Sequence, residues 1–99
     1  MKFETISASK IEECIANKDM IIIDVRNPNE YHKGHIPTSI NIPYNKFDKL
    51  KRSLPKEKTL IIYCERGGVS LILSRDLAKE GYMVNNIYGG INAYGGVLE

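Results

Sequence analysis

Residues 59–70 read TLIIYCERGGVS, an apolar run that ends in a cysteine and is followed by a pair of glycines. A short run rich in β-branched and aromatic residues is typical of a strand that is covered on both faces, as in a parallel sheet. From Val69 onward, apolar residues recur at helical spacing until Gly81, which supplies a stop signal. The stretch therefore predicts a buried strand that turns within a few residues into a helix, with Cys64 at the turn.

Strands and helices are predicted to alternate on both sides of this stretch. Ser9 with Glu12, and Asn27 with Glu30, have the spacing of helix N-terminal caps. Because alternating strands and helices join through right-handed crossovers, we expect an α/β fold with a central parallel sheet between helix layers. Strands are expected near residues 3–6, 20–25, 39–42 and 83–88, and helices near 9–17, 27–34, 47–54 and after 89–90.

The helix after residue 68 is expected to pack one apolar face against the sheet. Its polar residues Ser70, Ser74 and Lys79 are predicted to face water. This assignment follows the spacing of the apolar residues. The side chains expected in the core are Val69, Ile72, Leu73 and Leu77.

The composition is that of an ordinary globular protein, with 99 residues, 42% hydrophobic, 26% charged and a formal net charge of +2. One domain over residues 1–99 is expected, with a core that needs no disulfide. Basic residues gather between Lys46 and Lys58, which we interpret as a solvated face rather than a docking patch for an acidic partner. No apolar run approaches the ~20 residues that cross a membrane, and no secretion signal is recognised. We therefore expect a cytoplasmic protein without membrane or nucleic-acid partners.

The two cysteines are interpreted differently. Cys14 shares the apolar face of the first predicted helix with Ile11 and Ile15, which indicates a small core residue. Cys64 is expected at the sheet edge beyond the carboxyl ends of the strands, where ligands gather in such folds. Cys64 is therefore the candidate for chemistry, and neither cysteine is expected in a disulfide.

The loop after Cys64 has the features of an anion-binding turn. Gly67 and Gly68 allow backbone conformations that are closed to other residues, and the following helix aims its free amides back into the loop. A ring of amide donors would hold the Cys64 sulfur, a persulfide built on it, or the oxyanions of a donor. It would also lower the pKa of the thiol, so Cys64 is predicted to be a thiolate nucleophile.

Several short motifs occur in a characteristic order along the chain. They are Asp24-Val25-Arg26, Glu30-Tyr31, Gly34-His35-Ile36-Pro37, Asn41-Ile42-Pro43, Tyr63-Cys64 and Gly89-Gly90-Ile91. Together they make the chain resemble the single-domain rhodanese-like sulfurtransferase family over essentially its whole length. The resemblance implies a rhodanese-like three-layer fold whose central parallel sheet has about five strands.

The resemblance also implies a mechanism. Cys64 would take the outer sulfur of a donor such as thiosulfate or a persulfide, become a persulfide, and pass the sulfur to a thiol or protein-cysteine acceptor in a ping-pong cycle. No cofactor and no metal ion are implied, and a monomer is expected. Asp24 is expected to support the site by fixing Arg26 or loop amides. The residues expected to bind substrate are Arg26, Glu65, Arg66, Gly67, Gly68, Val69 and Ser70.

Two departures from the family pattern bear on the substrate. Glu65 follows Cys64 and Val69 closes the loop, where many thiosulfate-active relatives carry basic side chains. A Glu65 carboxylate turned inward would repel a dianionic donor and raise the pKa of the thiol. A phosphatase or arsenate reductase of the same fold is one alternative, but Val69 and Ser70 stand where its oxyanion-binding arginine is needed. A non-catalytic rhodanese-like docking module is the other alternative.

Overall fold

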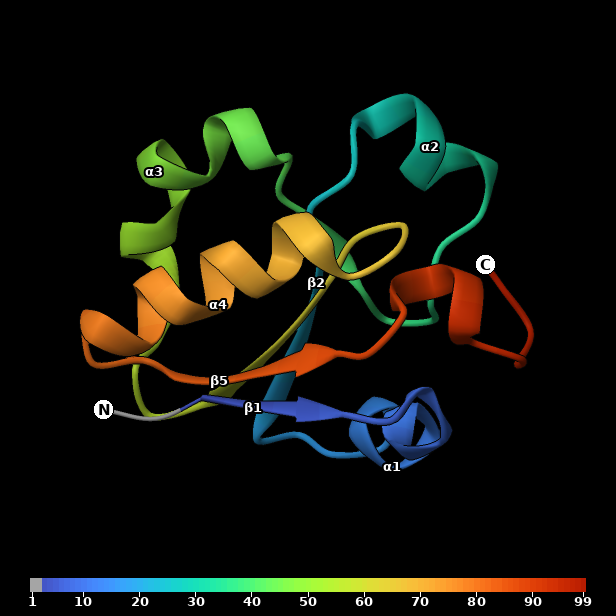
Figure 1. Cartoon of the computed structure of the whole chain (residues 1–99), viewed down its shortest axis with the longest axis horizontal. Helices are drawn as coiled ribbons and strands as arrows, with labels where there is room; N and C mark the ends of the chain where they lie inside the picture. Colours follow the sequence, from blue (N-terminus) through green and yellow to red (C-terminus); the bar gives the residue numbers. More distant parts are fainter. Residues whose placement is uncertain (1–2) are drawn as a thin grey trace.

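Within residues 3–99, which the computed structural model describes, five parallel strands form one sheet with the order β1-β5-β4-β2-β3 (Figure 1). The strands are β1 (Phe3–Ile6), β2 (Met20–Asp24), β3 (Ile40–Asn41), β4 (Thr59–Tyr63) and β5 (Met83–Ile87). The α-helices are α1 (Ile11–Ile15), α2 (Pro28–Lys33), α3 (Phe47–Leu50) and α4 (Gly68–Lys79). Shorter 3-10 turns are η1 (Ala8–Lys10), η2 (Tyr44–Lys46), η3 (Lys51–Ser53) and η4 (Gly90–Ala93). β4 is therefore the middle strand of the sheet.

Helices cover both faces of the sheet. α3 and α4 contribute Phe47 and Leu77 to the core of one face. α1 contributes Ile11 and Cys14 to the core of the other face, and Ile91 of η4 packs against it. The expected α/β architecture, with a central parallel sheet of five strands between helix layers, is confirmed. Over residues 3–99, no helix is long and apolar enough to cross a membrane.

The side chains of β4 and the residue that follows it alternate between the two cores. Ile62 and Cys64 belong to the core beneath α3 and α4, whereas Tyr63 belongs to the core of the opposite face. Cys14 lies in that second core, as expected for a packing residue, and both cysteines are free. Because the sheet separates the two sulfurs, they cannot form a disulfide while the fold is intact.

The predicted cap of the second helix is confirmed and that of the first is wrong. At α2, Glu30 N–H donates to Asn27 Oδ1 at 2.9 Å, and Asn27 Nδ2 donates to Glu30 Oε1 at 2.9 Å. The first helix begins instead as η1, with Ser7 as its cap, and Ser9 N–H donates to Ser7 Oγ at 3.2 Å. Ser7 has the extended backbone that a cap requires, whereas Ser9 already lies inside the turn.

The segment 47–54 is not one continuous helix. It consists of α3, four residues long, followed by the 3-10 turn η3. Phe47 and Leu54 are buried as their spacing predicts, but Leu50 is exposed. Phe47 and Leu54 thus pack the two ends of the segment against the sheet.

The buried face of α4 differs from the one that the apolar spacing predicts. Leu73 and Leu77 are buried as expected, but Val69 and Ile72 are 41% and 46% exposed. The serines predicted to face water are fully buried instead: Ser70 and Ser74. Their hydroxyls tolerate burial because each forms a hydrogen bond inside the fold, such as Ser74 Oγ to Ser70 C=O at 2.7 Å. α4 is therefore rotated so that Ser70, rather than Val69, faces the middle of the molecule.

Candidate active site

The ends of β2 and β4 bring the chemically distinctive residues to one edge of the sheet. Asp24 pairs with Tyr63 in the parallel register, and Val25 N–H donates to Tyr63 C=O at 3.0 Å. Val25 and Cys64 therefore follow two adjacent strand ends. Tyr44 N–H donates to Val25 C=O at 3.0 Å, which brings η2 to the same edge. Cys64 thus lies where open α/β sheets usually bind ligands.

The loop 64–70 wraps its backbone amides around the Cys64 sulfur. Gly67 N–H donates to Sγ at 3.0 Å and Ser70 N–H at 3.5 Å, while Ser70 Oγ lies 3.5 Å from the same sulfur. Gly67 has φ of 100°, a conformation that favours glycine, whereas Gly68 has no positive φ and its missing side chain faces open space. The prediction that both glycines are needed for special backbone conformations is therefore correct for Gly67 only.

The start of η4 forms hydrogen bonds to the backbone of the cysteine loop. Ile91 N–H donates to Cys64 C=O at 2.9 Å, and Asn92 N–H donates to Glu65 C=O at 3.1 Å. Gly90 has φ of 61°, and a Cβ there would lie 2.6 Å from the carbonyl carbon of Glu65. The start of η4 can lie this close to the cysteine loop only because position 90 has no side chain.

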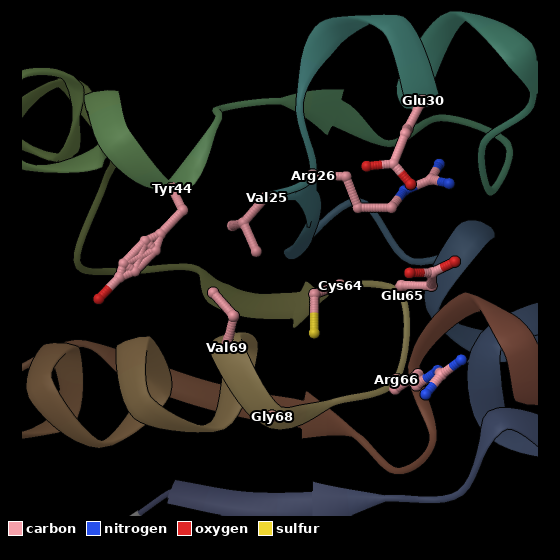
Figure 2. Close-up of a pocket in the computed structure, with 9 residues that line it drawn as sticks. All are labelled: Val25, Arg26, Glu30, Tyr44, Cys64, Glu65, Arg66, Gly68 and Val69. Carbon is pink, nitrogen blue, oxygen red and sulfur yellow. The ribbon is translucent and has the colours of Figure 1, made fainter.

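Hydrogen bonds set the acidity of the Cys64 thiol. Burial alone would raise its pKa, but hydrogen bonds from the Ser70 hydroxyl and from the amides of Ser70, Gly67 and Arg66 outweigh burial, and the pKa of Cys64 lies below its usual value. The largest contributions to this lowering come from Ser70 and the loop amides rather than from Glu65. Its carboxylate points away from the sulfur (Figure 2). The thiolate is therefore stabilised by dipoles that are built into the loop.

Cys64 opens onto a pocket of about 400 Å³ with two unlike sides. Figure 2 shows Val25, Tyr44 and Val69 on one side of the sulfur, and Glu30, Arg26, Glu65 and Arg66 on the other. The pocket thus gathers six of the predicted site residues, which are Arg26, Cys64, Glu65, Arg66, Gly68 and Val69. The other two predicted residues of the loop, Gly67 and Ser70, are buried and contact the sulfur. Across residues 3–99, no three His, Cys, Asp or Glu side chains form a group that could hold a metal ion.

Comparison with known proteins identifies the family of this fold and site. The model for the rhodanese-like domain matches residues 7–96. The chain belongs to the rhodanese-like domain family. The family predicted from the sequence motifs is therefore confirmed.

Relatives of this rhodanese-like chain are named sulfurtransferases. A tRNA sulfurtransferase of Desulfurococcus amylolyticus is 37% identical over 81 residues, which cover 82% of this chain but only 16% of that protein. The thiosulfate sulfurtransferase GlpE of Coxiella burnetii is 26% identical over 95 residues, which cover 95% of this chain and 89% of that protein. The crystal structure of a rhodanese-related protein from Thermoplasma volcanium has a TM-score of 0.89 and 28% identity, and the match covers 97% of both chains. The rhodanese-like three-layer fold is thereby confirmed.

Arg26 of this rhodanese-like site is held in a clamp. Its Nε donates to both carboxylate oxygens of Asp24 at 3.1 Å, and its Nη2 donates to Asp24 Oδ2 and to Gly34 C=O, each at 2.7 Å. Burial lowers the pKa of Arg26, but the hydrogen bond and charge of Asp24 raise it more, so the guanidinium stays protonated. The clamp ties the end of β2 to the turn that follows α2. Most donors of Arg26 are therefore occupied within the protein.

Asn86 is a further residue beside the sulfur that sequence reasoning did not identify. It is buried on β5 and its Oδ1 contacts the hydroxyl of Ser70. The single proton of that hydroxyl has three neighbouring acceptors, namely Asn86 Oδ1, Gly67 C=O at 3.2 Å and the Cys64 sulfur. Asn86 Oδ1 is the nearest of these acceptors, so it competes with the thiolate for the Ser70 proton.

We expect Ser70→Ala to raise the pKa of the Cys64 thiol, because it removes the side-chain hydrogen bond that contributes most to lowering it. A hydrogen bond to a charged group contributes on the order of 1.5 kcal/mol, so alkylation by iodoacetamide below the pKa is expected to slow roughly tenfold. The rate of alkylation across pH measures this. Ser74→Ala is the matched control, since Ser74 lies one turn further along α4 and donates its hydroxyl to the Ser70 carbonyl rather than to the sulfur. An unchanged pH profile for Ser70→Ala would contradict the assignment.

Sequence signals existed for some of the residues that were missed. Asn86 is a polar residue inside the strand predicted near 83–88, and a polar side chain that a strand buries is usually hydrogen-bonded. Val25 and Glu30 lie inside the motifs quoted for the family, but nothing in their spacing shows which way they point. Tyr44 reaches the pocket only through the pairing of η2 with the end of β2. These three depend on tertiary contacts.

Proposed function

We propose that this rhodanese-like protein is a sulfurtransferase that carries sulfane sulfur as a persulfide on Cys64. The observation that carries the proposal is the Cys64 sulfur itself, which accepts amide hydrogen bonds from Gly67 and Ser70, has a lowered pKa, and opens onto a pocket. A lowered pKa increases the fraction of the thiol that is present as thiolate, which is the nucleophilic form. The same amides can hold the negative charge of a terminal persulfide sulfur.

The proposed cycle has two displacement steps. In the first, the Cys64 thiolate attacks the outer sulfur of thiosulfate or of a persulfide donor. The donor S–S bond breaks, its electron pair leaves with sulfite or with the donor thiolate, and a Cys64 persulfide remains. In the second, an acceptor thiolate attacks the outer sulfur of that persulfide and the Cys64 thiolate leaves again. No net oxidant or reductant is needed, because sulfane sulfur only changes its carrier.

The acceptor is proposed to be an external thiol or protein cysteine. Cys14 cannot take the sulfur from Cys64, because it lies in the core on the other face of the sheet. Turnover therefore requires a second molecule that enters the pocket.

The geometry favours this function over the phosphatase or arsenate reductase alternative. Oxyanion chemistry of that type needs a guanidinium aimed at the reacting group from the end of the loop. Val69 and Ser70 occupy that end, and Arg66 points away from the sulfur (Figure 2). The non-catalytic docking alternative is less well supported, because it gives no reason for a buried cysteine with a lowered pKa.

Intact-mass measurement tests the proposal directly. The protein is incubated separately with thiosulfate, polysulfide and a cysteine-persulfide donor, and we expect a gain of one sulfur that maps to Cys64. Cyanide or a thiol acceptor is expected to remove this sulfur and to restore the starting mass. If all three donors leave the mass unchanged, the sulfurtransferase proposal is wrong.

A further inference from the structure

We propose that the partner of the Cys64 site is a protein segment whose reacting cysteine has an apolar residue on one side and a basic residue on the other. The inference rests on the proposed function and specifies the class of sulfur donor or acceptor. It follows from the two unlike sides of the pocket, one apolar and one carrying carboxylates. Neither side aims a cation at the sulfur that would favour thiosulfate, a small dianion, over a peptide.

The charged side of the pocket favours a cation. Arg26 forms an ion pair with the buried Asp24, so these two charges compensate each other. The Glu30 side chain accepts a hydrogen bond from Asn27 at the helix cap, and its charge helps to raise the pKa of Arg26. Neither Glu30 nor Glu65 has an ion-pair partner within 4 Å among residues 3–99. The carboxylates of Glu30 and Glu65 thus remain at the edge of the pocket, and in the part of the chain that the structure describes Arg66 is the one cation that lines the pocket besides the paired Arg26.

Arg66 does not turn this side into an anion site. Its guanidinium extends from the loop away from the sulfur and away from Glu30 (Figure 2). The residues that line the pocket carry two positive and two negative charges, but the buried Asp24 behind them pairs with Arg26 and leaves Glu30 and Glu65 against Arg66. A lysine or arginine next to the partner's cysteine would meet Glu30, and it would meet Glu65 at the outer edge of the pocket, since the Glu65 carboxylate points away from the sulfur.

The apolar side extends beyond the pocket. Tyr44 and Val69 line it and are 45% and 41% exposed. Ile72 is also exposed and lies three residues after Val69 on α4, so the two side chains share one face of the helix. The apolar surface is therefore longer than a small sulfur donor needs. It suits a residue that neighbours the cysteine in a peptide chain.

Thiol–disulfide exchange tests the inference without relying on sulfur transfer. The probes are acetylated, amidated tripeptides with cysteine in the centre, activated as 2-thiopyridyl disulfides. The Cys64 thiolate attacks the peptide sulfur, the S–S bond to the pyridyl group breaks, and pyridine-2-thione leaves. In one peptide of a pair, Leu and Lys flank the cysteine, and in the other peptide Leu and Glu flank it. Each pair is made twice, with Leu before the cysteine and with Leu after it. The rate ratio of the Lys peptide to the Glu peptide is measured for the faster order.

We expect the Lys peptide to react about fivefold faster than the Glu peptide at low salt, since exposed ion pairs contribute modestly and are screened by salt. In the double variant Glu30→Lys and Glu65→Lys, the ratio is expected to invert. The intrinsic reactivity of each peptide disulfide is the same with the wild-type protein and with the double variant. A change in the Lys-to-Glu rate ratio between the two proteins therefore reports the charge of the pocket. Glu57→Lys is the matched control, because this exposed carboxylate does not line the pocket. It is expected to keep the wild-type ratio.

The apolar side is tested with Ile72→Ser, an exposed position whose substitution leaves the core unchanged. This variant is expected to lower the preference for a Leu over a Ser peptide by about twofold to threefold, in proportion to the apolar area removed. Equal rates for Lys and Glu peptides, or an unchanged ratio in the double variant, would overturn the inference. Those results would leave the mass test of persulfide formation untouched, so failure of the inference and failure of the proposed function are distinguishable.

Discussion

Replacing Cys64 by serine is expected to abolish the persulfide adduct and to lower sulfur transfer at least about a thousandfold, a loss of more than ~4 kcal/mol of transition-state stabilisation. The hydroxyl of serine stays protonated at neutral pH, so the amides of Gly67 and Ser70 have no anion to stabilise. Serine is close to cysteine in size, so the loop is expected to keep its conformation. Intact mass and the rate of thiocyanate or persulfide production measure the effect.

Cys14→Ala is the matched control for this variant. Cys14 is the other cysteine of the chain and lies in the core of the opposite face. Its replacement is expected to lower the free energy of unfolding and to leave the sulfur adduct on Cys64. Transfer that persists in Cys64→Ser, or an adduct that disappears in Cys14→Ala, would show that the reactive sulfur was assigned to the wrong residue.

Gly90→Ala is expected to slow formation of the Cys64 persulfide about a hundredfold, the cost of displacing a reacting group by about 1 Å. The added methyl group would meet backbone atoms of Cys64 and Glu65, and backbone cannot move aside as a flexible side chain can. The loop must then shift away from η4, and with it the amides that hold the sulfur. The rate of adduct formation and the pH profile of thiol alkylation both report this change.

Gly95→Ala makes the same substitution five residues further on, where the structure shows open space around the position. We expect it to keep the wild-type rate and pH profile. Unfolding curves for both variants separate loop displacement from loss of the fold. A folded Gly90→Ala protein with the wild-type rate would mean that η4 does not control the loop.

The local sequence predicted an element correctly where its residue types favour a single structure. The run at 59–64 predicted a buried strand, which the structure shows as β4, and Asn27 with Glu30 predicted the start of α2. Ser7 and Ser9 show the limit of this reasoning, because both can cap a helix and only the backbone conformation at Ser7 decides between them. Which serine caps the helix depends on the backbone path between β1 and η1.

The sequence by itself determined the alternation of strands and helices, the family, and the presence of a cysteine in a glycine-containing turn. Periodicity and turn chemistry are local properties, so they can be recognised in the chain without its fold. The sequence predicted that Asp24 fixes Arg26 or loop amides, and the structure shows the ion pair with Arg26. Tertiary structure alone decided that Ser70 faces the sulfur while Val69 faces the pocket, and that Glu65 points away from Cys64. Each of these depends on which way a side chain leaves the backbone once β2, β4 and η4 are packed together. That direction is set by contacts between segments far apart in the chain, and spacing along the sequence does not encode it.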